Sequence, residues 1–158
     1  MARVTDIFRD SVLINLSLVD VVINNCSDEL WEKKFGGDYY WAQVFHLIGG
    51  VSYFMGLVGQ EGLPMIPENT GTDGILRKPS DPSLDHSKEK ALAFNKEMMT
   101  AVAAAFDRLD DSTLFTPIDF YGNPTTHGGM YSLLAAHILY HIGACDAALR
   151  DNGLTAAI

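Results

Sequence analysis

The stretch WAQVFHLIGGVSYFMGLV, residues 41–58, decides the fold because it is apolar nearly all round and carries no formal charge over 18 positions. A run of this length lies near the lower limit for a membrane span, and it is also typical of a helix enclosed by other helices. Gln43 and His46 interrupt it, no basic residue directly flanks it, and its Gly49-Gly50 pair would let another helix approach closely or leave room for a ligand. We therefore interpret residues 39–58 as the most enclosed helix of a bundle, with a membrane span as the alternative.

Three other segments show the three- and four-residue spacing of apolar positions that indicates amphipathic helices. The first covers about residues 4–24, and the last covers about residues 130–150, with a C-terminal cap at Asn152-Gly153. The remaining one begins near Ser87, a favoured N-cap residue, and carries Glu89 in its first turn. The apolar stripe of the first helix is Ile7, Val12, Ile14, Leu18, Val21 and Val22. The buried face expected for the last helix is Met130, Leu133, Leu134, Ile138 and Ala144.

The segments between these helices contain prolines and glycines that argue against regular structure. The longest connector runs from Gly59 to His86, and a loop of this size in a compact domain could fold over one end of the bundle. Shorter connectors cover residues 31–37 and 116–129, and no segment is typical of a strand. The sequence thus predicts an all-α fold, a four-helix bundle with a long loop between helices 2 and 3, as a single domain over residues 1–158.

Composition and charge exclude several classes of function. The formal net charge is −9, from 20 acidic and 11 basic side chains, and no cluster of Lys and Arg is present. Such a chain repels phosphate backbones and anionic membranes, so we expect neither nucleic acid nor a membrane as a partner. Cys26 and Cys145 do not make a disulfide framework, and the N-terminus interleaves acidic and basic residues unlike a secretory signal. We expect a soluble, cytoplasmic protein.

Two histidines of the last helix carry the clearest chemical signal. His137 and His141 are four residues apart, and their positions fall on the expected buried face. Side chains at i and i+4 of a helix stand about 5–6 Å apart at Cβ, so both imidazoles can bind one metal ion. The alternative is that each ring is separately hydrogen-bonded in the core or at the surface.

A third histidine favours the metal interpretation. His46 lies midway along the other strongly apolar helix, and bundles build metal sites from side chains on facing helices. A lone core histidine is the alternative for this residue. His86 and His127 lie in connectors and are expected to be solvated bystanders.

Other chemistries fit the pattern less well. The candidates lack the Glu-x-x-His pairs of di-iron bundles and the H-E-x-x-H motif of zinc proteases. Cys145 lies too far along the helix from His137 to share its ion, and we interpret it as a packed thiol. Tyr53, two turns after His46, could reach the same cavity, as could Tyr140, although ordinary packing explains both tyrosines.

The ordered set of these features resembles a known family over nearly the whole chain. Residues 41–54, WAQVFHLIGGVSYF, look like the second-helix segment of the DinB-like (DinB/YfiT-like) family. Residues 136–143, AHILYHIG, resemble its H-x-x-x-H-x-G signature, and the Ser87-Lys88-Glu89 start of the third helix also matches. The resemblance implies an up-down-down-up four-helix bundle, a homodimer, and a divalent metal ion on His46, His137 and His141. The metal that it implies is zinc or nickel.

The resemblance also implies a range of functions. Characterised members of the family include transferases and isomerases that use bacillithiol, mycothiol or glutathione. Relatives often carry Gln after the glycine of the signature, where this chain has Ala144. The expected function is therefore a metal-dependent hydrolase or thiol S-transferase acting on a small-molecule substrate, with activation of water or thiolate on the three-histidine metal. The alternative is a non-catalytic stress-response module that binds a ligand or metal.

Overall fold

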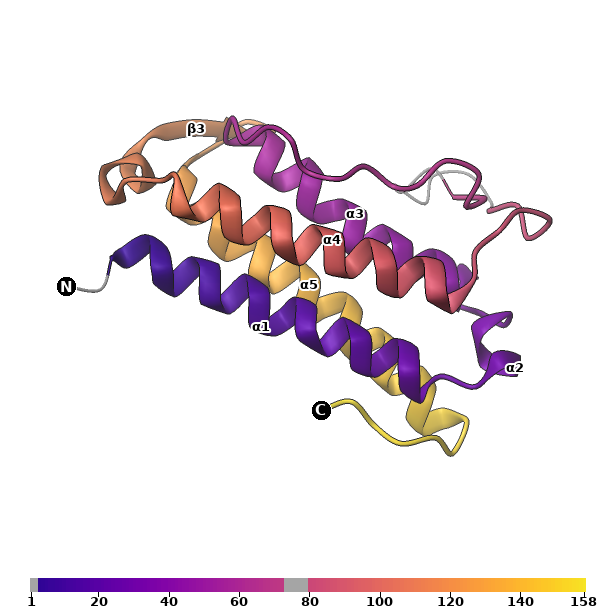
Figure 1. The fold of residues 1–158 in the computed structure, drawn as a ribbon. Coiled ribbons are helices and arrows are strands. Elements are labelled where there is room, and N and C mark those ends of the chain that lie inside the picture. Colours follow the sequence, from indigo (N-terminus) through magenta and orange to yellow (C-terminus); the bar gives the residue numbers. More distant parts are fainter. Residues whose placement is uncertain (1–2, 73–79) are drawn as a thin grey trace.

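The computed structural model describes residues 3–72 and 80–158, and most of these residues are helical (Figure 1). The long helices are α1 (Val4–Asn25), α3 (Tyr40–Leu57), α4 (Lys88–Asp107) and α5 (His127–Asp151). A short helix α2 (Asp28–Trp31) precedes α3, and a 3-10 helix η1 (Asp111–Phe115) follows α4. The predicted predominance of helix is confirmed, and the bounds of the long helices agree with the prediction to within a few residues.

The long helices lie side by side along a common direction (Figure 1). Helix α1 packs against α4 and α5, and α3 packs against the same two helices. In Figure 1 the chain runs one way along α1 and α5 and the opposite way along α3 and α4. Residues 58–72 of the connector after α3 run back along the length of α3 in Figure 1, beside that helix rather than over one end of the four long helices.

Two short antiparallel strand pairs correct the prediction that the chain forms no strand. Strands β1 (Lys34–Phe35) and β2 (Asp38–Tyr39) pair before α3, and β3 (Pro117–Phe120) and β4 (Asn123–Thr126) pair before α5. Both turns contain residues with positive φ, which two-residue hairpin loops require: Gly36 and Gly37 in the first, Tyr121 and Gly122 in the second. Strands of two to four residues are too short for alternation to reveal them.

Side-chain caps define where two helices begin. Ser87 Oγ accepts a hydrogen bond from the backbone N–H of Lys90 at 3.3 Å, so the predicted N-cap of α4 is confirmed. Helix α5 begins earlier than predicted because Thr126 acts as its N-cap, its Oγ accepting from Gly129 N–H at 3.2 Å. At the other end Gly153 has φ +70°, the left-handed conformation that commonly follows a helix.

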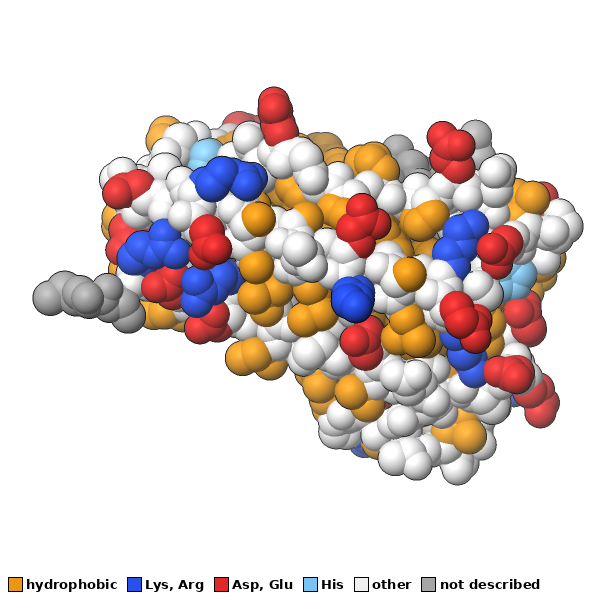
Figure 2. Space-filling view, viewed as in Figure 1, with side chains coloured by type: hydrophobic (Ala, Val, Ile, Leu, Met, Phe, Trp, Pro, Cys, Tyr) orange, Lys and Arg blue, Asp and Glu red, His pale blue; other side chains and the backbone are white. Residues whose placement is uncertain are grey.

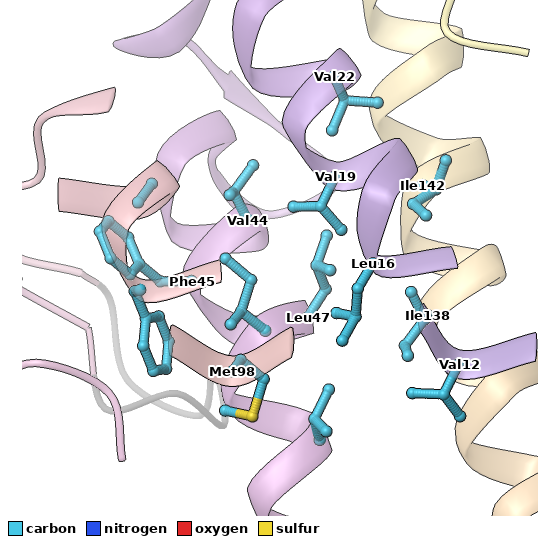
Figure 3. Packing of buried hydrophobic residues seen from close by; sticks show 14 of the residues in the cluster. Val12, Leu16, Val19, Val22, Val44, Phe45, Leu47, Met98, Ile138 and Ile142 are labelled. Carbon is cyan, nitrogen blue, oxygen red and sulfur yellow. The ribbon is translucent and has the colours of Figure 1, made fainter. Parts of the chain in front are cut away.

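The core lies between the four long helices (Figure 3). On α1 its residues follow the helical period as Val12, Leu16, Val19 and Ile23, each fully buried. The prediction that Ile7 and Ile14 belong to this stripe was wrong, because their side chains are 67% and 62% exposed on another face of the helix. On α5, Leu133 is also exposed and Ala144 is half-buried, whereas Met130, Leu134 and Ile138 are buried as expected.

The surface seen in Figure 2 carries acidic and basic side chains close together, with apolar side chains between them. Arg3 and Arg9 form ion pairs with Asp6 and Asp107, so the basic side chains near the N-terminus are matched by acids. Exposed pairs of this kind contribute little to stability.

One helix among the described residues is long and apolar enough to cross a membrane, and it is α5 rather than α3. Core helices of soluble proteins commonly meet the same criterion, so this single helix is weak evidence for a membrane span. Helix α3 is enclosed as predicted, with Trp41, Phe45, Leu47 and Ile48 fully buried.

Candidate metal centre

The structure brings the three predicted histidines together. His46 comes from the middle of α3, and His137 and His141 lie one turn apart on α5, so that one ligand nitrogen from each ring lies within 4.8 Å of the others. Nε2 of His46 and Nε2 of His141 are 3.2 Å apart. Two nitrogens bound tetrahedrally to zinc at about 2.0–2.1 Å would be separated by about 3.3 Å. The spacing is therefore that of a metal centre, and this histidine group could hold an ion.

The three side chains are half-buried, not enclosed in the core as the sequence suggested. The expected buried face of α5 contains Leu134 and Ile138, both fully buried, and Figure 3 shows Ile138 on the side of α5 that faces α1. The half-buried histidines lie on the border of this face. Helical phase alone places 137 and 141 on a common stripe but does not show where that stripe leaves the core. Partial exposure leaves the site accessible to a ligand.

The surroundings keep the rings of α5 uncharged. Burial, together with the nearby His46, lowers the pKa of His137 to about 4. Burial, together with His46 and His137, lowers the pKa of His141 to about 3. At neutral pH these imidazoles are neutral, which is the form that binds metal ions.

One buried polar atom without a hydrogen-bond partner indicates whether the three histidines fit a metal ion. Nδ1 of His137 is buried and has no hydrogen-bond partner among the described residues. A buried polar group in this condition costs about 1–3 kcal/mol, and native structures rarely leave one unexplained. Three imidazole nitrogens within 4.8 Å of one another, with one ring left short of a protein partner, fit a divalent ion.

A glycine of α3 lets His137 reach the site. A Cβ added at Gly50 would lie 2.8 Å from Cε1 of His137, so the ring occupies the space that any other residue would fill. The neighbouring Gly49 makes similar room for Ile66 of the connector, at 2.6 Å from an added Cβ. The Gly49-Gly50 pair thus lets two other segments approach α3 closely. The His137 ring of α5 lies against Gly50, and Ile66 of the connector lies against Gly49.

A cavity of about 1040 Å³ opens beside the histidines, within the size range of ligand-binding pockets. His46 and His137 line one wall, together with residues of α3 from Gly49 to Phe54. The connector forms the opposite wall through residues 65–72 and is fastened to α3 where Ser52 Oγ donates to the carbonyl oxygen of Pro64 at 2.5 Å. Residues 65–72 of the connector therefore lie beside the histidine group.

Several cavity residues were not predicted from the sequence, among them two acids and a tyrosine. Glu68 and Asp81 come from the connector, and Tyr121 comes from the turn between β3 and β4. Side-chain and backbone hydrogen bonds from Ser83 lower the pKa of Asp81, so its carboxylate is ionised. Nothing in the sequence marks the two acids, because the connector has no periodic spacing of apolar residues. For the turn, the one available signal is the Tyr121-Gly122 pair between two short runs.

The two tyrosines considered in the sequence differ. Tyr53 lines the cavity, and its hydroxyl lies 2.5 Å from that of Tyr121. Tyr140 is 73% exposed and is not among the cavity residues, although its ring meets His141 edge-on at 5.1 Å. Tyr53 lines the cavity, although the sequence favoured ordinary packing for it, and Tyr140 does not line it.

His86 and the two cysteine thiols pack against other parts of the protein and lie outside the histidine group. His86 was expected to be solvated, but its ring stacks on Trp41 at 4.2 Å and contacts Glu32 at 2.8 Å. It fastens the end of the connector to the start of α3. Burial raises the pKa of both Cys26 and Cys145 to about 12, so both are unreactive packed thiols, as predicted for Cys145.

Comparison with known proteins supports the resemblance at the level of fold. No protein-family model matches the sequence, and no curated protein matches it significantly. The crystal structure of a DinB-like protein from Bacillus cereus ATCC 10987 is similar, with a TM-score of 0.72 at 19% identity, covering 94% of this chain and 93% of that chain. This chain therefore has a DinB-like fold.

Proposed function

We propose that this chain with a DinB-like fold is an up-down-down-up four-helix bundle that binds one divalent metal ion through His46, His137 and His141. The observation that carries the proposal is the meeting of three ligand nitrogens within 4.8 Å beside the cavity. Zinc and nickel both accept imidazole nitrogen, and three protein ligands leave a coordination position open, as in catalytic zinc sites.

This arrangement favours one of two reactions. The first is hydrolysis of a small-molecule substrate, and the second is transfer of a low-molecular-weight thiol such as bacillithiol, mycothiol or glutathione to an electrophile. A metal bound there would supply an activated water or thiolate. The protein's own residues position the reactants: Phe54 packs against the His137 ring at 5.0 Å, and the connector limits access of water from the opposite wall. Glu68 of the cavity wall provides a carboxylate that could accept a proton.

Metal analysis of protein purified without chelator tests the binding site. We expect about one equivalent of zinc or nickel in the wild type and little in His46→Ala, His137→Ala and His141→Ala. Replacement of His86, which packs outside this histidine group, is the matched control and should leave the metal content unchanged. Equal metal content in all the proteins would refute the three-histidine site.

Consumption of a thiol together with an electrophile, with and without metal, tests the reaction. Metal-dependent turnover supports the transferase, and metal-dependent ester cleavage supports the hydrolase. The alternative is a non-catalytic stress-response module, which Ala144 favours because it offers no side-chain amide near the site. Tight ligand binding without turnover would support that module.

We also propose a cytoplasmic homodimer. The exposed apolar residues of α5, Leu133, Leu139 and Tyr140, support self-association because they lie on one helix with no charged neighbour between residues 127 and 145. Light scattering on the purified chain checks this, and a monomer at micromolar concentration would contradict it.

A further inference from the structure

The turn between β3 and β4 holds a tyrosine in a conformation that its residue type disfavours. Tyr121 has φ +52° and the following Gly122 has φ +81°, both between the paired residues Phe120 and Asn123. Two positive φ values in a two-residue loop define a type I′ turn, in which Asn-Gly is the preferred sequence. A bulky residue in this conformation is a genuine outlier, and such outliers cluster at functional sites.

Contacts explain what holds this strained residue. The ring of Tyr121 lies 4.8 Å from that of Phe120, and Phe120 lies 6.1 Å from Phe54 on α3. Phe54 in turn packs against His137. An aromatic series therefore connects the turn to the metal centre, although the side chain of Tyr121 itself remains 75% exposed. The ring is fixed in place without being buried, so packing alone does not explain the choice of tyrosine.

The hydroxyl of Tyr121 points to a polar role. It meets the hydroxyl of Tyr53, and both residues line the same cavity as His46 and His137. When Tyr53 donates to Tyr121, the O–H of Tyr121, whose side chain is 75% exposed, can donate to a third oxygen. The pair thus presents a hydrogen-bond donor at the cavity, held from two different elements of the fold.

The cavity limits which oxygen can accept this bond. Among the cavity residues that the structure describes, the charged ones are Glu68 and Asp81, both acidic. With a net charge of −9 on the chain, an added carboxylate would be repelled. A neutral carbonyl oxygen accepts the same bond without that cost, and Phe54, Met65, Ile66 and Leu84 offer an apolar wall to the rest of the ligand.

From this geometry we infer that Tyr53 and Tyr121 form a paired phenol site that positions a neutral, apolar or aromatic ligand by its carbonyl oxygen. The inference rests on the proposed function in that the cavity beside the histidines is taken as the ligand site. It adds the substrate class and two positioning residues that act on the ligand, not on the metal.

Calorimetric titration with two matched probes tests the inference. Acetophenone carries the carbonyl, and ethylbenzene has a methylene in its place. The ratio of the Kd for ethylbenzene to the Kd for acetophenone should fall about 3- to 10-fold in Tyr53→Phe and in Tyr121→Phe, since one neutral hydrogen bond is worth about that much. Tyr121→Asn should lower the ratio equally while raising thermal stability, because Asn suits the turn.

Tyr140→Phe removes an exposed phenol outside the cavity and should keep the wild-type ratio. An unchanged ratio in all the cavity variants, or no binding of acetophenone to the wild type, overturns the inference. If Tyr53→Phe loses its helical circular dichroism, the two Tyr121 variants decide. Metal content measured on protein purified without chelator separates the two proposals. A chain that holds no metal in that state yet shows the change in ratio refutes the metal centre and retains the phenol pair.

Discussion

Helices α3 and α5 are both strongly apolar and both supply histidines to the site, yet they are surrounded differently. Helix α3 has α4 and α5 on its flanks and the connector along its outer side, and its residues around His46 are almost all buried. Only 39% of the most apolar window of α5 is buried, and Leu139 and Tyr140 face solvent. Apolar composition therefore measures what a helix can bury, whereas the packing of other segments over each of its faces decides what it does bury.

The largest expected effect contrasts one leucine from each helix. Leu47 of α3 is fully buried, so Leu47→Ala should lower the free energy of unfolding by about 2–5 kcal/mol through lost burial and a cavity. Leu139 of α5 is 43% exposed, and Leu139→Ala should change it by about 0.5 kcal/mol or less. Urea denaturation measures both. If Leu139→Ala lowered the free energy of unfolding by more than about 2 kcal/mol, Leu139 would have to be buried in solution. A partner would then cover the outer face of α5, and α5 would be as enclosed as α3.

Metal removal tests whether the site ties the two helices together. A ligand that binds only the folded chain at 100 to 1,000 times its Kd stabilises it by about 2.7–4.1 kcal/mol, so a chelator should lower the Tm of wild-type protein. His137→Ala lacks an α5 ligand and should show no chelator-dependent shift. An equal shift in the two proteins would mean that the metal binds elsewhere.

A smaller effect is expected from the close approach between the helices. Gly50→Ala would push against the His137 ring, because the new Cβ falls 2.8 Å from Cε1. Displacing a ligand ring should weaken metal binding by about 10- to 100-fold, the size seen when the groups that orient a ligand are removed. A competition titration with a metal indicator measures the change. Wild-type affinity in this variant would show that the ring can move without loss of the site.

The smallest effect uses one open glycine from each helix. Added Cβ atoms at Gly56 of α3 and Gly143 of α5 meet nothing within 4 Å. Replacing either by Ala should stabilise the chain by about 0.5–1 kcal/mol, because alanine loses less entropy in a helix. Thermal unfolding compares them. Destabilisation by Gly143→Ala alone, with Gly56→Ala behaving as expected, would again indicate a partner on α5.

Much of the fold and the site histidines could be predicted from the sequence. Ser87 begins α4, Gly153 follows the end of α5, and the i, i+4 relation of His137 and His141 follows from helical geometry, because these are local properties of the backbone. The errors involve relations between elements. Ile7, Ile14 and Leu133 are apolar but exposed, since the face on which a helix meets its neighbours depends on packing that no single helix encodes.

The cavity residues mark the same limit. Glu68, Asp81 and Tyr121 lie far from the histidines along the chain and in segments without a period. The β3–β4 hairpin escaped prediction because its turn needs positive φ at Tyr121 and Gly122, and tyrosine is not a residue that favours it.

The amino-acid sequence by itself determined where the long helices lie, the absence of basic clusters, and which histidines are available for a metal. These depend on neighbours within a turn or two, or on composition alone. The tertiary structure decided that His46 meets His137 and His141, that Gly50 admits a ring, and that the connector and Tyr121 enclose a cavity beside them. The reason is physical: the distances between side chains on different elements depend on how the whole chain packs, and no local pattern contains them.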